Sequence, residues 1–461
     1  MLGFQYFNND LLVLIKTYIT GVEVFKIILT CPTYADDMGI LLSSKKAVQL
    51  VLNIIRMYAS LWRMRYNSTK CTIIVFGKDS CPNMDICLGD QIIKVKAADK
   101  HLGTLLTDNS KEIDLFIAHR IKECHKPGYA INAMGSRQVP VPINCANKAY
   151  WSICVPKLTY GLEIMTLSTS NIQKCESFHA EIAKSIQGLP SQTANYGAVC
   201  TMGWMSIQSV IDIKRMTFLW HLLCLPLRTI FKKLLIRRYT SITYCDTVAP
   251  QGPLYKMLQT CRKYNLLNTV CNALESGIYM SKREWKKIIT EKVWQHENHR
   301  WKFISMLFSN LRGLRAGIKE VKMWSWWRYA SSDPKHGKDI RTILKMLLNV
   351  HQLNSVTAHH EHNSTPRCQF CDTGAVESVA HMLFACSDPE TCVSRNRLWA
   401  VVKENGPNNL ITEIELLSIE ERTIFLLTGL NNTYTPEWSA WLDNVKSFLV
   451  QMYIKRVVAK A

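Results

Sequence analysis

The sequence lacks an apolar run long enough to cross a membrane. Its longest apolar stretch, Leu11 to Leu29, is interrupted by Lys16, Glu23 and Lys26, whereas a transmembrane helix needs about 20 predominantly apolar residues. The amino-terminal segment also lacks the basic start and the small-residue cleavage pattern of a secretory leader. We therefore expect a protein of the cytoplasm, the nucleus or both, neither secreted nor bound in a membrane.

Acidic residues are scarce relative to basic ones, with 36 Asp and Glu against 56 Lys and Arg and a net charge of +20. Between Lys282 and Lys345 the chain carries sixteen basic and six acidic residues, together with six of its thirteen tryptophans. Basic side chains interleaved with aromatic ones suit a nucleic-acid strand, through phosphate neutralisation and base stacking. The alternative is a helical domain whose tryptophans form the core and whose basic residues face solvent. The residues predicted to bind nucleic acid are Lys282, Arg283, Lys286, Lys287, Arg300, Lys302 and Arg328.

A compact, even-numbered cysteine framework is also lacking. The seventeen cysteines are spread along the chain, which favours reduced, buried thiols over a disulfide scaffold. After a long stretch without cysteine, however, Cys368, Cys371, His381 and Cys386 follow one another with the spacing Cys-x2-Cys-x9-His-x4-Cys. Four such ligands form a closed tetrahedral site, so this pattern predicts a structural zinc ion. Scattered buried thiols are one alternative, and substitution by Cys392 or by the cluster His359, His360 and His362 is another; that cluster is also typical of a solvated loop.

Two adjacent carboxylates, Asp36 and Asp37, lie between two short apolar runs in the segment Tyr34-Ala35-Asp36-Asp37. Mg²⁺ takes hard oxygen ligands, and one or two carboxylates plus substrate phosphates complete its shell. In a two-metal site the ions stabilise the attacking and leaving oxygens of an in-line displacement. The pair therefore predicts a site for Mg²⁺ or Mn²⁺, although aspartate is also a common turn residue.

The segments around this pair alternate between strand and helix patterns. A helical period runs from a cap at Ser43 or Ser44 to about Tyr66-Asn67, and is followed by a strand over Cys71 to Phe76. A hairpin is then predicted from Met84 to Leu88 and Ile92 to Lys96, joined by Gly89-Asp90. Further along, Ile172 to Ile186 and Ile207 to Leu223 have helical periods, and His179 on the apolar face of the first is expected to be a core residue and not a ligand. The fold class expected is α+β, with the aspartate pair at the lip of the mixed layer.

Several short motifs resemble the reverse transcriptases of non-LTR (LINE-type) retrotransposons. The resemblance covers about residues 1 to 240 and returns near 340 to 400. The matching residues are Tyr34-Ala35-Asp36-Asp37, Asn67-x-x-Lys70 followed by Phe76-Gly77, His101-Leu102-Gly103, Arg120-Ile121-Lys122, Tyr160-Gly161-x-Glu163, Gly188-Leu189-Pro190, and the Cys368 to Cys386 knuckle with Glu377 and Arg395 or Arg397 at flanking positions.

The resemblance implies roles for these residues. Asp36, Asp37 and Lys70 would be catalytic, with Lys70 near the incoming triphosphate; His101, Leu102 and Gly103 would form the primer grip, where His101 departs from the family's tyrosine. RNA template, DNA primer or target, and other retrotransposon proteins would be the partners. The implied order is a partial palm (1–115), a helical thumb and connector (116–245), a basic Trp-rich helical region (246–355), a zinc knuckle (356–400) that grips RNA or target DNA, and a helical tail (401–461).

The same resemblance argues against activity of this chain alone. The family's polymerase uses a third aspartate on an upstream palm strand and a fingers region before it, whereas about thirty residues precede Tyr34 here. Asp10 is a candidate substitute ligand, but it also opens an apolar helical stretch. We expect a reverse transcriptase-like protein that is inactive by itself. The alternatives are a non-catalytic RNA- or DNA-binding protein that uses the basic helical region and the knuckle, and a decayed element with no selected function.

Overall fold

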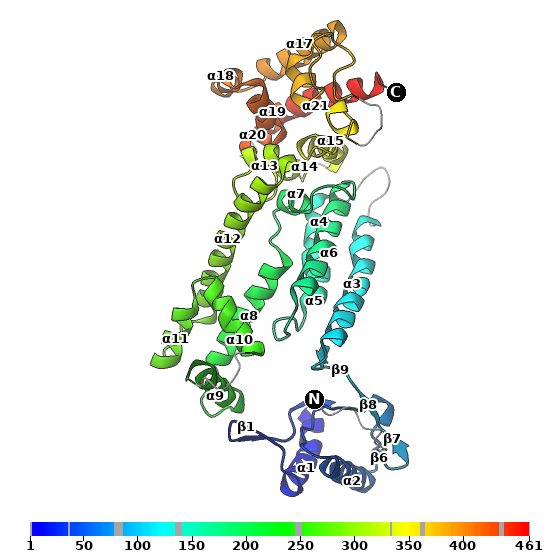
Figure 1. Cartoon of the computed structure of the whole chain (residues 1–461), viewed down its shortest axis with the longest axis vertical. Helices are drawn as coiled ribbons and strands as arrows, with labels where there is room; N and C mark the ends of the chain where they lie inside the picture. The colour runs from blue at the N-terminus through cyan, green and yellow to red at the C-terminus, as the bar shows by residue number, and fades with distance from the viewer. Residues whose placement is uncertain are drawn as a thin grey trace. The chain divides into compact units, whose positions relative to one another are not determined.

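The computed structural model describes residues 2–35, 37–77, 86–133, 141–244, 251–331, 334–359, 365–432 and 438–460, and no side chains for 2–8, 132–133, 334 and 431–432. Within these ranges the fold is mostly helical (Figure 1). Two compact units are found. The first unit comprises residues 1–120, 159–171 and 211–289, and the second comprises 121–158, 172–210 and 290–461.

The first unit contains every strand of the described chain. Its elements are α1 (Leu2–Tyr18), β1 (Val22–Val24), β2 (Ile27–Leu29), β3 (Thr33–Tyr34), β4 (Asp37–Met38), α2 (Lys45–Leu61), η1 (Ser68–Lys70), β5 (Thr72–Ile74), β6 (Cys87–Leu88), β7 (Gln91–Ile92), β8 (Lys94–Lys96), β9 (Asp99–His101), β10 (Thr104–Leu106), α9 (Ile230–Tyr244), α10 (Pro253–Lys263) and α11 (Leu267–Ser276). Five helices have residues in both units: α3 (Ser110–Ala133), α5 (Val155–Thr159), α6 (Thr169–Gln187), α8 (Ile207–Leu223) and α12 (Lys282–Leu307).

Helices α1 and α2 share the amino-terminal core. The Ser44 side chain accepts a hydrogen bond from the Ala47 amide, which caps α2 as predicted. The residues buried between the two helices are Leu11, Ile15, Ile19, Val51, Ile54, Ile55 and Tyr58. The predicted end of this helix near Tyr66-Asn67 is wrong, because α2 stops at Leu61 and leaves Trp62 exposed.

The described strands form five separate two-stranded sheets. Four are antiparallel hairpins, and β5 pairs in parallel with β8. The predicted hairpin is confirmed at its Gly89-Asp90 turn, with Leu88 opposite Gln91. Its predicted second strand is wrong beyond Ile92, because Lys94 to Lys96 form β8 and pair with β5 instead. These few short strands are compatible with the expected α+β class, although the chain is more helical than expected. The assignment of its parts to a palm and a thumb stays a prediction.

The second unit is mostly helical in its described part, with one short hairpin over residues 366–377 closed by the bridge between Arg367 and Val376. Its further elements are α4 (Ile143–Ala149), the π-turn η2 (Tyr150–Cys154), α7 (Asn195–Thr201), η3 (Ser309–Leu311), α13 (Arg312–Gly317), α14 (Ser325–Ala330), η4 (Pro334–His336), α15 (Gly337–Leu347), α16 (Asn354–Thr357), the π-turn η5 (His381–Ala385), α17 (Pro389–Glu404), α18 (Asn408–Leu416), α19 (Ile419–Leu427), α20 (Gly429–Asn432) and α21 (Ser439–Val458).

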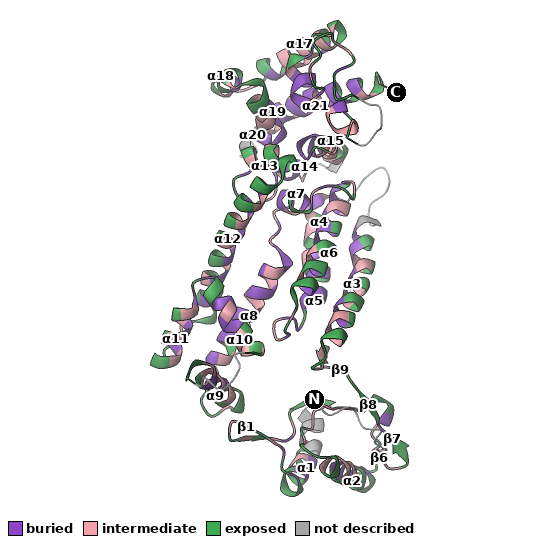
Figure 2. Cartoon of the chain, viewed as in Figure 1, coloured by how far each residue is buried: buried purple, intermediate pink, exposed green. Residues whose placement is uncertain are grey.

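Helix α21 lies at the centre of the carboxy-terminal part of this unit. It packs against α15, α17 and η5, and buried residues recur around its circumference, so most of it is purple in Figure 2. A helix buried on several sides has no wide polar face. Within the described residues, no helix combines the length and apolar character that crossing a membrane demands.

Candidate functional site

The predicted carboxylate turn lies on a small hairpin of the first unit. Strands β3 and β4 pair Tyr34 with Asp37, and Ala35 between them has a φ of +54°. Tyr34 and Asp37 are exposed, which suits a turn that meets a ligand, whereas Asp36 lies outside the described residues. Asp10 is an exposed residue of α1. The predicted Mg²⁺ or Mn²⁺ site is therefore described only in part.

Lys70 ends the short helix η1, and its place depends on Asn67. The Asn67 side-chain oxygen accepts hydrogen bonds from the Thr69 amide at 3.0 Å and from the Thr69 hydroxyl at 2.6 Å. This cap fixes the start of the helix that carries Lys70, whose side chain is exposed. The Asn-x-x-Lys spacing thus has a local structural reason, while the role of Lys70 stays a prediction.

His101, Leu102 and Gly103 form the turn of the hairpin β9–β10. Leu102 and Gly103 have φ values of +50° and +76°, as two-residue hairpin turns require. Tyr160 donates its hydroxyl to the Leu102 carbonyl at 3.1 Å, and Arg120 donates to the Gly103 carbonyl at 3.2 Å. Three motifs that are far apart in the sequence therefore meet at this turn. Its role as a primer grip stays a prediction.

The residues predicted to bind nucleic acid differ in their exposure. Lys282, Arg283, Lys286, Lys287 and Lys302 are exposed on α12. Arg300 is half-buried, lies 3.5 Å from Glu297 and stacks over the Tyr196 ring. Arg328 is half-buried in α14 and donates to the Ser325 hydroxyl at 2.9 Å. These two arginines thus make internal contacts.

For the tryptophans of the basic window, the structure favours the alternative in which they form the core of a helical domain. Five of the six tryptophans of the basic window are buried: Trp285, Trp301, Trp324, Trp326 and Trp327. Several are also fixed by hydrogen bonds, such as those from Trp301 to the Ile318 carbonyl and from Trp327 to the Gln187 side chain. They are unable to stack on bases without unfolding, so any polyanion contact here depends on lysine and arginine.

The candidate metal centre is built by a hairpin and a π-turn of the second unit. In the hairpin, the Cys368 amide donates to the Ala375 carbonyl at 2.8 Å and the Glu377 amide donates to the Pro366 carbonyl at 2.9 Å. Gly374 has a φ of +67°, which suits glycine in the connecting turn. On η5 the Cys386 amide bonds to the His381 carbonyl, and this five-residue turn brings His381 and Cys386 to the same side.

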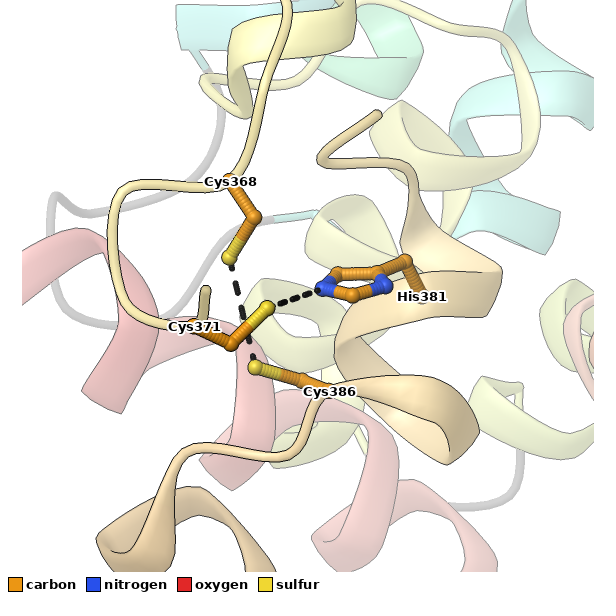
Figure 3. A group of neighbouring side chains, drawn as sticks. All are labelled: Cys368, Cys371, His381 and Cys386. Carbon is orange, nitrogen blue, oxygen red and sulfur yellow. Dashed lines mark hydrogen bonds between the residues drawn. The ribbon is translucent and has the colours of Figure 1, made fainter. Parts of the chain in front are cut away.

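The four predicted ligands converge (Figure 3). Their ligand atoms all lie within 4.8 Å of one another, and no other group of three or more potential ligands is found among the described residues. Cys368 Sγ lies 4.0 Å from Cys386 Sγ, and Cys371 Sγ lies 3.4 Å from His381 Nε2. A tetrahedral zinc ion with bonds of about 2.3 Å to sulfur and 2.0 Å to nitrogen separates its ligand atoms by about 3.5–3.8 Å. The donor set and its spacing therefore fit zinc.

The two thiols of the Cys-x2-Cys segment have different acidities. Burial disfavours ionisation of Cys371, but hydrogen bonds from the Thr373 hydroxyl and amide outweigh it and lower its pKa to about 6. Burial raises the pKa of Cys368 to about 11. Metal binding requires thiolates and therefore releases protons from this cluster.

The alternative ligands contribute nothing to the cluster in the described structure. The Cys392 thiol donates to the Cys386 carbonyl at 3.4 Å and accepts from Arg395 at 3.0 Å. His359 is exposed and does not belong to the four-residue group. His360 and His362 lie outside the described residues.

No protein-family model matches the chain. The sequence is similar to the RNA-directed DNA polymerase from mobile element jockey of Drosophila melanogaster, with 27% identity over 168 residues. The chain is a relative of a reverse transcriptase. The alignment covers 34% of this chain and 18% of that polymerase, so the chain spans less than a fifth of its relative's length.

Sequence reasoning missed the part that the tail plays at the metal centre. Arg456 of α21 and the flanking Glu377 are both buried beside the four ligands. The tail from Val401 carries a helical period but no chemistry that can be named from its residues alone. The available signal is two basic residues, Arg456 and Lys460, four positions apart at the end of the last helical period.

Proposed function

We propose that this chain is the nucleic-acid-binding and zinc-stabilised part of a retrotransposon reverse transcriptase-like protein. The observation that carries the proposal is the convergence of Cys368, Cys371, His381 and Cys386 within 4.8 Å, in a chain similar to a mobile-element polymerase. Neither observation depends on the other, since the cluster comes from geometry and the similarity from sequence.

The zinc ion would have a structural role. Three thiolates and one imidazole fill a tetrahedral shell, so no position is open for water or substrate. Cys368, His381 and Cys386 are buried, which also separates the ion from solvent. The ion would stabilise a short segment that consists mostly of turns.

Nucleic acid would bind at the start of α12. Lys282 and Lys286, and likewise Arg283 and Lys287, are four residues apart and form one exposed basic stripe. The stripe belongs to the first unit, and so does the hairpin turn held by Tyr160 and Arg120. Phosphates are its natural ligands, because each lysine or arginine that meets one releases a counterion.

We further propose that the chain does not polymerise DNA by itself. The aligned segment corresponds to 18% of the mobile-element polymerase, and two-metal transfer needs several carboxylates around the ions. Primer extension on an RNA template tests this, with background incorporation expected. Extension that disappears when Asp36 and Asp37 are both replaced by alanine would contradict the proposal and favour an active polymerase.

Nucleic-acid binding is tested by fluorescence anisotropy on a labelled single-stranded RNA at salt concentrations from about 50 to about 300 mM. The variant carries glutamine at Lys282, Arg283, Lys286 and Lys287; the control carries glutamine at the exposed residues Lys26, Lys45, Lys46 and Lys94, which removes the same charge. We expect affinity to fall steeply with salt, and the logarithmic slope to decrease by about one for each phosphate that the variant no longer neutralises. Equal slopes for variant and control would contradict the assignment to α12.

A further inference from the structure

Arg456 reaches the candidate metal centre from α21, 70 residues after the last predicted ligand. Its guanidinium donates to Cys386 Sγ at 3.1 Å and to Cys368 Sγ at 3.7 Å. It also donates to the Thr391 hydroxyl at 3.0 Å and lies 4.2 Å from the centre of the Phe370 ring. A buried guanidinium held by two sulfurs, a hydroxyl and an aromatic face has little freedom to turn away.

The charge of the centre gives this contact a physical reason. Zinc with three thiolates and a neutral imidazole carries a net charge of −1. Buried charges are costly unless they are paired and hydrogen-bonded. Arg456 is 4% exposed and brings one positive charge, together with N–H donors directed at two of the three sulfurs. The metal centre and Arg456 together are electrically neutral.

Arg456 also forms an ion pair with Glu377. Glu377 is fully buried, and its Oε1 lies 3.9 Å from Arg456 Nη1. Its Oε2 accepts from the Asn354 amide at 2.9 Å and is paired with Lys460, which follows Arg456 by four residues. Charges therefore alternate from the thiolates through Arg456 and Glu377 to Lys460. These pairs fix the orientation of the Arg456 guanidinium, and the two basic residues compensate the negative charge of Glu377.

We propose that Arg456 is a positioning residue of the zinc centre, and that the end of α21 completes the outer shell of the site. This inference rests on the proposed zinc ion. Arg456 shares its N–H groups between the sulfurs of Cys368 and Cys386, which come from the hairpin and the π-turn respectively. Loss of the guanidinium leaves both sulfurs without their charged donor and leaves the centre with an uncompensated negative charge. Zinc affinity depends on such outer partners, whose removal typically costs about 10- to 100-fold.

The test uses the full chain, with zinc alone as the probe. Affinity is measured by competition with a chromogenic chelator for the wild type, Arg456→Met, Arg456→Lys and the control Lys455→Met. Lys455 is the neighbouring exposed residue, which donates to Ser394 and makes no contact with a predicted metal ligand. We expect about 10- to 100-fold weaker binding in Arg456→Met. Arg456→Lys should fall between, because lysine keeps the charge but lacks a planar fork that serves two acceptors. Lys455→Met should equal the wild type.

A spectroscopic readout separates positioning from ligation. With Co²⁺ in place of zinc, both Arg456 variants should keep the charge-transfer absorption of three thiolates but at a shifted wavelength, since two sulfurs lose N–H donors. Zinc affinity and spectra equal to the wild type in folded variants would overturn the inference. If Arg456→Met does not fold, Arg456→Lys decides by the same criterion. A wild-type chain that binds no zinc would overturn the metal site itself, whereas tight binding that is insensitive to Arg456 would overturn only the role given to this residue.

Discussion

His179 is surrounded by aromatic rings in the second unit and is fully buried. Met205 offers only a carbonyl oxygen, 3.1 Å from Nε2, so Nε2 carries the proton. Nδ1 therefore accepts from the Tyr150 hydroxyl at 2.7 Å. Burial lowers the pKa of His179 to about 3. The expectation that this histidine is a satisfied core residue is confirmed.

This environment predicts acid sensitivity of the second unit. Because folding lowers the pKa of His179, the unfolded chain binds the proton more tightly than the folded chain. The contribution of neutral His179 to the free energy of unfolding is therefore fully present above the unfolded pKa of about 6.5. It is lost progressively as the pH falls towards about 3. His179→Gln should lower the free energy of unfolding at pH 7 by about 1–3 kcal/mol, since glutamine fits the two hydrogen bonds less well. On acidification, however, this variant should lose less of its free energy of unfolding than the wild type does.

Thermal melting at about pH 7 and at about pH 4.5, on either side of the unfolded pKa, measures both effects. His359→Gln is the matched control, because it makes the same substitution at an exposed histidine. An equal loss of melting temperature on acidification in His179→Gln and the wild type would show that His179 does not carry the effect.

Individual residues also show how far sequence reasoning reaches. The grouping of the four candidate metal ligands is predictable, because a metal imposes short, regular spacing within one segment. Arg456 is not, because its partners Cys386 and Cys368 precede it by 70 and 88 positions. The tryptophans mislead for a related reason: a basic, Trp-rich composition is the same whether the rings are buried or exposed, and only packing distinguishes the two.

Three predicted motifs of the first unit meet at the hairpin β9–β10, where Tyr160 and Arg120 bond to its turn. Gly103 has a positive φ, and a Cβ there would lie 3.1 Å from the Tyr160 ring. Gly89 in the hairpin β6–β7 has a similar φ of +66°, but an added Cβ would meet only the flexible Arg56 side chain at 3.9 Å. Both alanine substitutions incur backbone strain, whereas Gly103→Ala must also displace Tyr160.

We therefore expect Gly103→Ala to destabilise the first unit more than Gly89→Ala. Gly89→Ala should cost about 1 kcal/mol for the left-handed backbone, and Gly103→Ala should exceed it by about a further 1 kcal/mol from overpacking. Chemical denaturation followed by tyrosine and tryptophan fluorescence measures the difference. Equal costs would mean that Tyr160 does not press on this turn in solution.

Metal removal should act on particular elements of the second unit. The ligands lie in the hairpin and η5, and Arg456 links them to α21. Hydrogen exchange before and after chelation should therefore show reduced protection over residues 366–400 and in the last turns of α21. Helices α1 and α2, which share a separate core, should be unchanged. Reduced protection in α1 and α2 as well, or none anywhere, would contradict a local structural ion.

A helix is predictable from the sequence where a single amphipathic period buries one face against a single core. The helices over Ile172–Ile186 and Ile207–Leu223 are confirmed as α6 and α8, and Ser44 caps α2. The end of α2 is not predictable from its period, because Met64 and Tyr66 still pack against the same core after the helix has ended at Leu61. The order of the short strand pairs follows turn signals such as Gly89-Asp90, yet the parallel pairing of β5 with β8 depends on contacts distant in sequence.

At the scale of the whole molecule, a strongly basic chain is divided into two units. The basic stripe of α12 belongs to the first unit and the metal cluster to the second. Net positive charge raises the affinity for any polyanion, so binding to RNA alone says little about specificity. The candidate metal site would form only when the second unit is folded, so metal binding would be a more specific property of this chain than RNA binding.

The most direct test is the metal content of the intact protein, measured by native mass spectrometry after purification without chelator. The full chain should carry one zinc ion, and Cys386→Ser should carry none or lose it on brief exposure to chelator. Cys392→Ser should keep the ion, because Cys392 contacts the backbone and Arg395 instead of the cluster. A wild-type chain without zinc after incubation with the metal, or equal loss in Cys386→Ser and Cys392→Ser, would contradict the metal centre proposed for this protein.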